Sequence, residues 1–464
     1  MVDMDKTRRY LALRLILCMT ALLFLMFVFS GVSAAFYSDK NNNSNRVEIS
    51  LRAENVDNEK LIRQKDVTEV KQRLKKSVLS YVRELDSFVQ DNNRTYPVKA
   101  CLTDNAFTQF SDVYIVKGCF FNEATSEEGL NAAVISQALA EKLYGTYNVI
   151  GRRFELFNEK YKIIGLYRNK ESAISFFSSD GMERIYIPYR SYAAFKDLPF
   201  KTVFLRYEGL ETKGFRKNYI RELFKIDDQV YKINDFYEKS DVFTGLSGLF
   251  VFIIGLWSIF IAGRGLVNHC RSGYGHIKES MGKMYLKGML TEEKWFLMRM
   301  LLVILGSVAV MTIIFFVTRC KINIPAEYIP FDNVFDFKFY FEKLKMSVNS
   351  ANLSAGYIPT HLEASYNNAL KVKLIVLLLS LVSFLSMLPY IKLLKRLRYT
   401  GRTVVKIYVV PAAAALLLAL PLSFFSGVEF CLPLKAIAAV YIFLSLKLVG
   451  LPRFGKGGGS KEDI

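Results

Sequence analysis

The chain has 464 residues and a net charge of +19, and 52% of its residues are hydrophobic. Such a charge in a soluble protein would suggest a nucleic-acid partner, but here the basic residues flank long apolar runs, where membrane topology and anionic lipid headgroups explain them. We therefore expect a protein that binds the lipid bilayer and no nucleic acid.

Six apolar runs are long enough to cross a membrane, since about twenty helical residues rising about 1.5 Å each cover about 30 Å of hydrocarbon. The first run follows Lys6, Arg8 and Arg9 and ends in small residues, as a secretory signal does. It exceeds the usual apolar length of a signal, about 7–15 residues, which favours an uncleaved anchor. The six runs are residues 10–36, 242–263, 297–317, 374–394, 407–425 and 432–451.

Charge predicts the orientation, because basic residues are retained on the cytoplasmic side of membrane spans. Segments 1–14, 263–299, 391–406 and 447–464 together carry a net charge of +14. Residues 37–241, by contrast, contain 33 basic and 30 acidic side chains. This predicts a plasma-membrane protein with both termini in the cytoplasm and its main domain outside.

The predicted fold class is an α-helical multi-pass membrane protein, with about six transmembrane helices and a large extracytoplasmic α+β domain. Its segments are the N-terminus with the first span (1–36), the extracytoplasmic domain with a stalk (37–241), the second span (242–263), a cytoplasmic loop (264–296), the third span (297–317), an extracytoplasmic loop (318–373), the fourth span (374–394), a basic linker with an extra hairpin (395–451) and a glycine-rich cytoplasmic tail (452–464).

Within the external domain, apolar residues at three- and four-residue spacing predict a helix over residues 57–89. A turn region is expected at 122–129. A short apolar strand at 132–135 leads into a helix at 137–144, which Gly145 ends as a C-terminal cap. Further strands, expected to form a mixed sheet, are predicted at 112–116, 153–157, 161–167, 184–188 and 201–207.

Two cysteines of the six, Cys101 and Cys119, share the external domain, where an oxidising compartment permits a disulfide. The sequence leaves this bridge open. The outward loop carries aromatic residues for which local packing is favoured over binding of an apolar partner. Pro411 and Pro421 are expected to kink the first helix of the extra hairpin. The aromatic residues are Phe331, Phe335, Phe337, Phe339, Tyr340 and Phe341.

The segments AVISQALA at 133–140, LYG at 143–145, IGR at 150–152, YKIIG at 161–165 and IYIP at 185–188 occur in a characteristic order. In order and spacing they resemble the periplasmic core domain of MacB-like permeases. The motif supports a fold and not an active site. Its residues are Ile135, Ser136, Leu139, Ala140, Gly145, Gly151, Gly165 and Pro188.

The resemblance covers roughly residues 1–397 and implies a matching membrane plan. In such permeases the second span rises from the membrane as a stalk, which here would be one helix over 229–263. A cytoplasmic coupling helix within 264–298 would dock on a separate ATPase. This loop matches the family only loosely, so an ordinary basic cytoplasmic loop is the alternative. The candidate coupling residues are Lys278, Glu279, Lys283, Lys287 and Gly288.

The sequence lacks the motifs of a nucleotide-hydrolysing or hydrolytic enzyme. It contains no G-x-x-x-x-G-K-[ST], H-E-x-x-H or G-x-S-x-G segment and only three histidines. His361 and Glu363 are interpreted as solvated loop residues. We therefore expect no enzymatic activity, no metal and no directly bound cofactor, with ATP acting through a partner.

The predicted function is that of the membrane subunit of a MacB/FtsX-type ABC system. Its expected partners are a cytoplasmic ABC ATPase, a second permease subunit in a homo- or heterodimer, and a possible extracytoplasmic substrate or accessory protein. A non-transporting scaffold or sensor, which regulates a cell-wall enzyme or signalling partner, is the first alternative. A receptor-like protein without an ATPase is the second.

Overall fold

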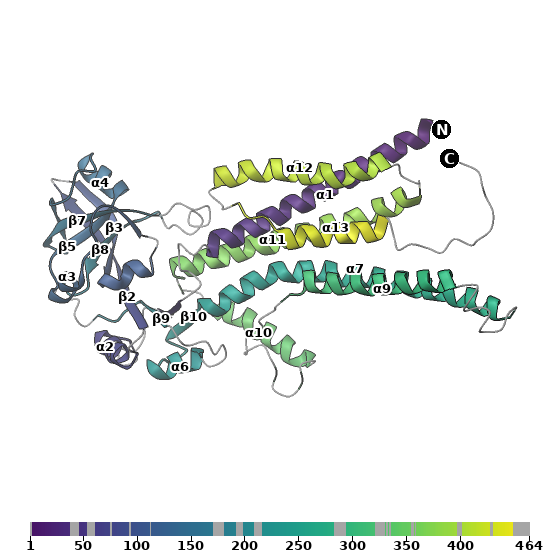
Figure 1. Cartoon of the computed structure of the whole chain (residues 1–464). Helices are drawn as coiled ribbons and strands as arrows, with labels where there is room; N and C mark the ends of the chain where they lie inside the picture. The colour runs from purple at the N-terminus through teal and green to yellow at the C-terminus, as the bar shows by residue number, and fades with distance from the viewer. Residues whose placement is uncertain are drawn as a thin grey trace.

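A β-sheet domain lies at one end of the protein, and long helices extend from it roughly side by side (Figure 1). The N-terminal helix begins at the end farthest from the sheet. The computed structural model describes residues 2–37, 46–52, 61–74, 77–91, 94–111, 113–169, 181–191, 198–207, 216–282, 294–320, 330, 333, 336–353, 357, 359–396, 401–426 and 430–448.

The sheet is mixed and runs in the order β10-β1-β9-β2-β3-β8-β5-β7-β4, with β6 paired to β2 and β7. The β3–β8 and β5–β7 pairs are parallel, whereas β1 is antiparallel to both β9 and β10. The strands are β1 (Val47–Leu51), β2 (Ser77–Asp91), β3 (Arg94–Thr103), β4 (Val113–Gly118), β5 (Ala132–Ser136), β6 (Arg153–Leu156), β7 (Glu159–Asn169), β8 (Glu183–Pro188), β9 (Thr202–Tyr207) and β10 (Tyr231–Asp235).

Among the described residues, the helix predicted over 57–89 is confirmed only at Gln64–Arg73 and is wrong from Ser77 onward. A short helix, α2 (Gln64–Arg73), is followed by the long strand β2, which pairs with both β3 and β9. Leu79 packs into the core on one face of the sheet and Val82 into the core on the other. Because both faces of β2 are covered, its apolar residues do not alternate cleanly, and their spacing imitates that of a helix.

The turn predicted at 122–129 is also wrong in kind. Residues Glu123–Glu128 form a short helix, α3. The Asn122 side chain accepts a hydrogen bond from the Thr125 amide, and Gly129 adopts the left-handed conformation at φ 69° that ends the helix.

The strand predicted at 132–135 and the helix predicted at 137–144 are confirmed. Strand β5 leads into α4 (Gln137–Tyr144), where the Ser136 side chain accepts a hydrogen bond from the Leu139 amide at 3.0 Å. Gly145 ends α4 at φ 64°. Gly165 lies so close to its neighbour that an added Cβ would sit 2.3 Å from the Cys119 carbonyl oxygen. These residues therefore serve the packing of α4 and β7.

The remaining motif residues belong to the same part of the fold. Ile135 is buried in β5, and Ala140 is buried on α4. Gly151 adopts φ 90° in the turn before β6, a conformation that favours glycine. Pro188 ends β8 opposite Thr103. The motif is thus gathered around α4, β5, β7 and β8.

The two cysteines of the external domain are free. Cys101 lies on β3, while the Cys119 amide donates to the Ile164 carbonyl on β7 at 3.1 Å. Three inter-strand steps separate β3 from β7 in the sheet order, or about 14 Å at about 4.8 Å per step. Disulfides require Cα atoms within about 7 Å, so this fold excludes the bridge.

Five helices are long and apolar enough to cross a membrane among the residues that the structure describes: Lys6–Ala34, Phe236–Met281, Lys294–Thr318, His361–Arg396 and Gly401–Phe425. They correspond to α1 (Val2–Tyr37), α7, α9, α11 and α12 (Gly401–Ser426). The helix of the sixth predicted span, α13 (Leu434–Leu448), has 15 residues. The count of six spans therefore stays a prediction.

The helices pack as one bundle. Leu15, Met19 and Leu22 of α1 are fully buried in a core shared with α7, α11 and α13. Trp257 of α7 packs against the rings of Phe384 on α11 and Phe443 on α13, with centroids 5.7 and 5.9 Å away. The first helix thus packs in the bundle core.

The stalk predicted as one helix over residues 229–263 is wrong at both ends. Residues 231–235 form strand β10, and the helix begins only at Phe236. It then continues past residue 263 to Met281. With 46 residues it is about 70 Å long at about 1.5 Å per residue. A single element therefore joins the sheet to the far end of the bundle (Figure 1).

Candidate functional site

The two points where the chain enters and leaves the external sheet lie side by side. Strand β1 follows α1 and pairs with β10, which leads directly into α7. In this register Val47 lies opposite Asp235, and the Phe236 amide donates to the Arg46 carbonyl at 3.1 Å. Movement of either α1 or α7 would therefore reach the same edge of the sheet.

Asp235 fixes the start of α7. Its carboxylate accepts hydrogen bonds from the amides of Tyr237 and Glu238 at 3.0 and 3.3 Å, which is a helix N-cap favoured by the helix dipole. The Arg216 guanidinium donates to both carboxylate oxygens at 3.1 and 3.0 Å and lies 4.3 Å from the Tyr237 ring. Helix α6 (Arg216–Leu223) thereby holds the first turn of α7.

A buried carboxylate on α11 ties that helix to the same place. The Glu363 side chain is 2% exposed, and it accepts from Lys232 at 2.6 Å and from Asn234 at 2.9 Å, both on β10. Lys239 of α7 lies 3.8 Å from Glu363, and the Tyr357 hydroxyl also donates to it. The interpretation of Glu363 as a solvated loop residue is therefore wrong.

A second buried carboxylate joins β1 to the start of α11. Glu48 accepts a hydrogen bond from the Thr360 hydroxyl at 2.6 Å. Its Oε1 lies 3.1 Å from Arg46 Nε, an ion pair without the alignment of a hydrogen bond. Burial raises the pKa of Glu48, and the Arg46 charge opposes that shift. Arg46 also donates to the Phe110 carbonyl, which ties the cluster to the sheet domain.

Next to this polar cluster, three helices meet in an apolar cluster. Val32 of α1 packs with Phe236 and Phe243 of α7 and with Leu362 and Tyr366 of α11. We call the polar and the apolar cluster together the junction. Its polar residues are Arg46, Glu48, Lys232, Asn234, Asp235, Lys239 and Glu363. The junction joins β1, β10, α1, α7 and α11, and its apolar cluster also includes Ala369.

One buried cation lies next to the junction. Lys373 of α11 has no exposed surface, and its ammonium group donates to the Phe243 carbonyl of α7. The Nζ atom lies 4.6 and 3.9 Å from the ring centroids of Phe29 and Phe243. The cation thus bridges α1, α7 and α11 through a carbonyl and two aromatic rings.

The polar groups of the junction are paired with one another within the protein. Its carboxylates are occupied by lysine, arginine, asparagine and hydroxyl partners within the protein. Among the residues that the structure describes, no group of three or more histidine, cysteine or acidic side chains could hold a metal ion. The arrangement can hold three helices and two strands in one geometry.

The candidate coupling residues lie far from the junction. Lys278 and Glu279 are exposed in the last turn of α7, at the end of the bundle opposite the sheet (Figure 1). Lys283, Lys287 and Gly288 lie outside the described residues. Helix α7 therefore runs without a break from the junction to Lys278 and Glu279.

Sequence reasoning missed the junction residues Arg46, Glu48, Asn234, Asp235 and Glu363. One signal was available for the start of α7. Asp235 precedes an apolar helix and is followed three residues later by Glu238, which is a recognised pattern of a helix N-terminus. The contacts of Glu363 with β10 and of Glu48 with Thr360 join residues far apart in the chain and have no local signature.

Comparison with known proteins supports the resemblance seen in the sequence. Residues 12–211 match the family described as MacB-like periplasmic core domain. This match confirms the assignment drawn from the motif at 133–188. No match was found among curated proteins.

Several solved structures are similar to part of the chain. The extracellular domain of the noncanonic ABC-type transporter YknZ from Gram-positive bacteria has 12% identity and a TM-score of 0.32, covering 41% of this chain and 100% of that one. The periplasmic region of MacB from Actinobacillus actinomycetemcomitans has 10% identity and a TM-score of 0.35, covering 42% and 92%. A domain of a putative permease protein from Porphyromonas gingivalis has 13% identity and a TM-score of 0.30, covering 42% and 91%.

Proposed function

We propose that the chain, whose residues 12–211 match the MacB-like periplasmic core domain, is an ABC transporter permease of the MacB/FtsX type and transmits motion from a separate cytoplasmic ATPase to its extracytoplasmic domain. The ATPase would engage the end of α7 around Lys278 and Glu279, together with Lys283, Lys287 and Gly288. Helix α7 would carry the displacement to the junction, and a pair of permease subunits would act together.

The observation that carries this proposal is the continuity of α7. It runs unbroken from Phe236 to Met281 and begins at a residue whose neighbour, Asp235, is the last residue of a sheet strand. No flexible connection intervenes between them. A shift of the far end of α7 would therefore move β10 directly, and Glu363 would carry it to α11.

The proposal also fixes what the chain itself does not do. ATP binding and hydrolysis are assigned to the partner, since the sequence contains no phosphate-binding loop. The cytoplasmic placement of both termini follows from the basic segments that flank the spans. The chain would then supply the membrane and external parts of the assembly, without a metal or cofactor of its own.

The first test is capture of the ATPase. We would purify the tagged full-length protein from its native host and compare wild type with a variant whose residues 279–290 are replaced by a Gly/Ser linker. An ABC ATPase should co-purify with wild type and be lost from the variant. Absence of an ATPase from both preparations would contradict the proposal and favour a receptor-like protein.

A second variant tests the junction itself. Glu363→Gln alters the junction at the other end of α7, so this variant should still capture the ATPase. With ATP and Mg²⁺ added to the captured complex, hydrogen exchange at β1 and β10 should change in wild type and change less in Glu363→Gln. Equal changes in both proteins would show that the junction does not transmit motion.

The scaffold or sensor alternative would use the same junction. It differs in the outcome outside the membrane, because the partner would be an enzyme or signalling protein and no substrate would cross. A hydrolase or histidine kinase that co-purifies with the complex in an ATP-dependent manner would favour this alternative.

A further inference from the structure

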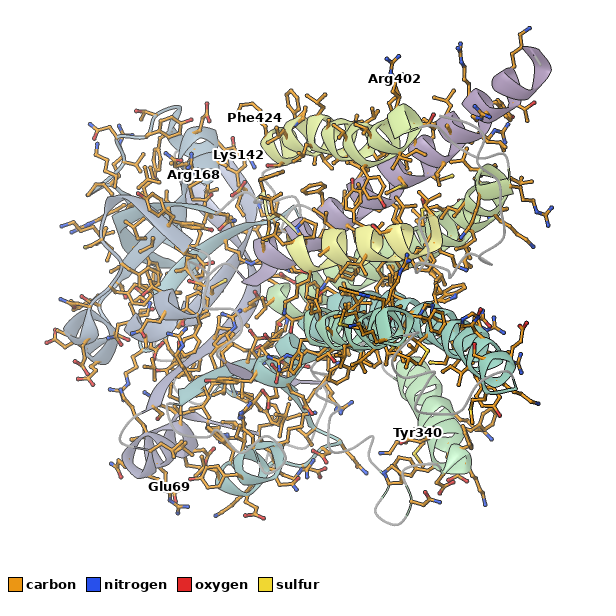
Figure 2. All side chains as sticks on the ribbon, turned by 45° about the vertical axis from the view of Figure 1, so that its right-hand side comes forward. Glu69, Lys142, Arg168, Tyr340, Arg402 and Phe424 are labelled. Atoms are coloured by element: carbon orange, nitrogen blue, oxygen red, sulfur yellow. The ribbon has the colours of Figure 1, made fainter. Side chains whose placement is uncertain are left out.

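Helix α10 (Phe337–Leu353) lies between two membrane helices in the sequence, after α9 (Lys294–Thr318) and before α11 (His361–Arg396). It diverges from the bundle near the sheet-side ends of α7 and α9 (Figure 1). Tyr340, labelled on α10, lies away from the packed helices (Figure 2). The helix thus projects sideways on the extracytoplasmic side.

The sheet-side end of α9 gives a reference point along the bundle for the position of α10. Thr318 packs against Gly255 of α7, and the Cys320 thiol lies 3.7 Å from the Gly245 carbonyl oxygen. The span α9 therefore ends beside Gly255 of α7, and the chain that follows it passes Gly248 and Gly245 toward the sheet. An apolar span reaches its sheet-side end here, and α10 lies near this end of the bundle in the view of Figure 1.

The side chains of α10 form an exposed aromatic stripe. Phe337 is 80% exposed and Phe341, one helical turn later, is 69% exposed, with Tyr340 beside them at 37%. Aromatic side chains of this size each bury about 150–250 Å² when covered. Positively charged residues adjoin the stripe, since Lys338 and Lys345 are exposed on the same helix.

We propose that α10 lies in the outer interface of the bilayer, with Phe337 and Phe341 among the lipid acyl chains and Lys338 and Lys345 at the headgroups. Aromatic residues concentrate at this depth of a membrane, and lysine side chains extend from it toward the headgroups. The net charge of the helix, with three lysines and one glutamate, suits an anionic lipid surface. The occupant of the stripe is therefore lipid.

This placement has a consequence for the junction. Only residues 354–360 separate the end of α10 from the start of α11, and Glu363 lies in the first turn of α11. An α10 held at the bilayer surface would keep this carboxylate at a fixed depth. The inference itself depends only on the membrane character of the chain and not on a partner ATPase.

Tryptophan fluorescence in lipid nanodiscs would test the proposal. Trp257 and Trp295 would first be replaced by Phe in the full-length protein, which has two tryptophans. Single tryptophans would then be introduced by Phe341→Trp or Phe337→Trp, with Glu342→Trp as the matched control about 100° further round the same helix. Nanodiscs holding one copy of the protein would contain either ordinary or brominated phosphatidylcholine with phosphatidylglycerol.

Brominated lipid should quench tryptophan at 341 and 337 at least about twofold more than at 342, because only the first two would reach the acyl chains. Iodide in the aqueous phase should show the opposite order. Weak lipid quenching with strong iodide quenching at 341 would place the stripe in water and overturn the proposal. Protection from both quenchers would overturn it in favour of packing against protein.

Discussion

At the scale of single residues, the junction depends on charges that are removed from water. Glu363 and Glu48 are almost completely buried, and each would be costly without its partners. Their partners come from β1, β10, α7 and the segment before α11, so each carboxylate reports on the relative position of several elements. Loss of one partner leaves an unpaired buried charge and should therefore destabilise the whole junction.

Glu363→Gln should therefore destabilise the protein. It leaves Lys232 and Lys239 without their counter-charge, and breaking a buried ion pair costs about 3 kcal/mol. The apparent melting temperature of the full-length protein in detergent should fall clearly. The control is Glu69→Gln, which removes an exposed i,i+4 pair with Arg73 and should cost less than about 0.5 kcal/mol. Equal effects of both substitutions would contradict the role given to Glu363.

Asp104 should give the external domain a distinctive pH dependence. Burial raises the pKa of Asp104 from 3.8 to about 6, although a hydrogen bond from Ser80 opposes this shift. The folded protein therefore holds this proton more tightly than the unfolded chain, so stability falls as pH rises from about 4 to about 6 and then levels off. The loss attributable to this group is about 3 kcal/mol.

Asp104→Asn should remove that dependence, since asparagine stays neutral throughout. Melting temperatures of both proteins between about pH 3 and about pH 8, a range that brackets both pKa values, give the comparison. The variant should gain stability relative to wild type as pH rises through this window. Parallel profiles for the two proteins would show that Asp104 does not titrate as inferred.

At the scale of secondary-structure elements, small residues decide how closely α7 and α9 pack. A Cβ added at Gly255 would lie 2.1 Å from the Thr318 hydroxyl oxygen, and one at Gly273 would lie 2.5 Å from the Met300 sulfur. In lipid the surroundings are as apolar as the helix side chains, so no hydrophobic effect drives helices together. Helices there usually associate through close packing at small residues. The α7–α9 pair is therefore stabilised by close van der Waals packing at Gly255 and Gly273.

Gly255→Leu should force α9 away from α7. Overpacking of this kind costs about 1–3 kcal/mol, and the apparent melting temperature in detergent should fall accordingly. Gly263→Leu is the matched control on the same helix, because a Cβ there meets nothing within 4 Å. Should Gly263→Leu prove as damaging as Gly255→Leu, helix packing would not be the cause.

At the scale of the whole molecule, one long helix connects the two ends of the protein. The sheet-side end of α7 is held by Asp235, Arg216 and Glu363, while its other end carries Lys278 and Glu279. An unbroken helix resists bending because every interior carbonyl is hydrogen-bonded along its axis. The proposed function requires this stiffness.

Phe260→Pro should break the proposed transmission without removing either end of it. Proline in a helix interior removes a hydrogen bond and kinks the chain, at a cost of about 3 kcal/mol. Phe260 is 56% exposed, and Phe260→Ala serves as the control that removes the ring alone. The proline variant should still capture the ATPase but lose the ATP-dependent change in hydrogen exchange at β10. Retention of that change would show that motion reaches the sheet by another route.

The sequence alone determined the features that depend on local patterns. The apolar runs predicted the membrane helices because their length must match the bilayer, and the residues from Ala133 to Pro188 predicted both α4 with its caps and the family of the external domain. The tertiary structure alone decided the rest. Strand β2 resembled a helix in sequence because both of its faces are buried, and Glu363 resembled a surface residue because its partners on β10 lie more than a hundred residues away in the chain. Burial and long-range pairing are properties of the folded chain, and no local spacing of residues encodes them.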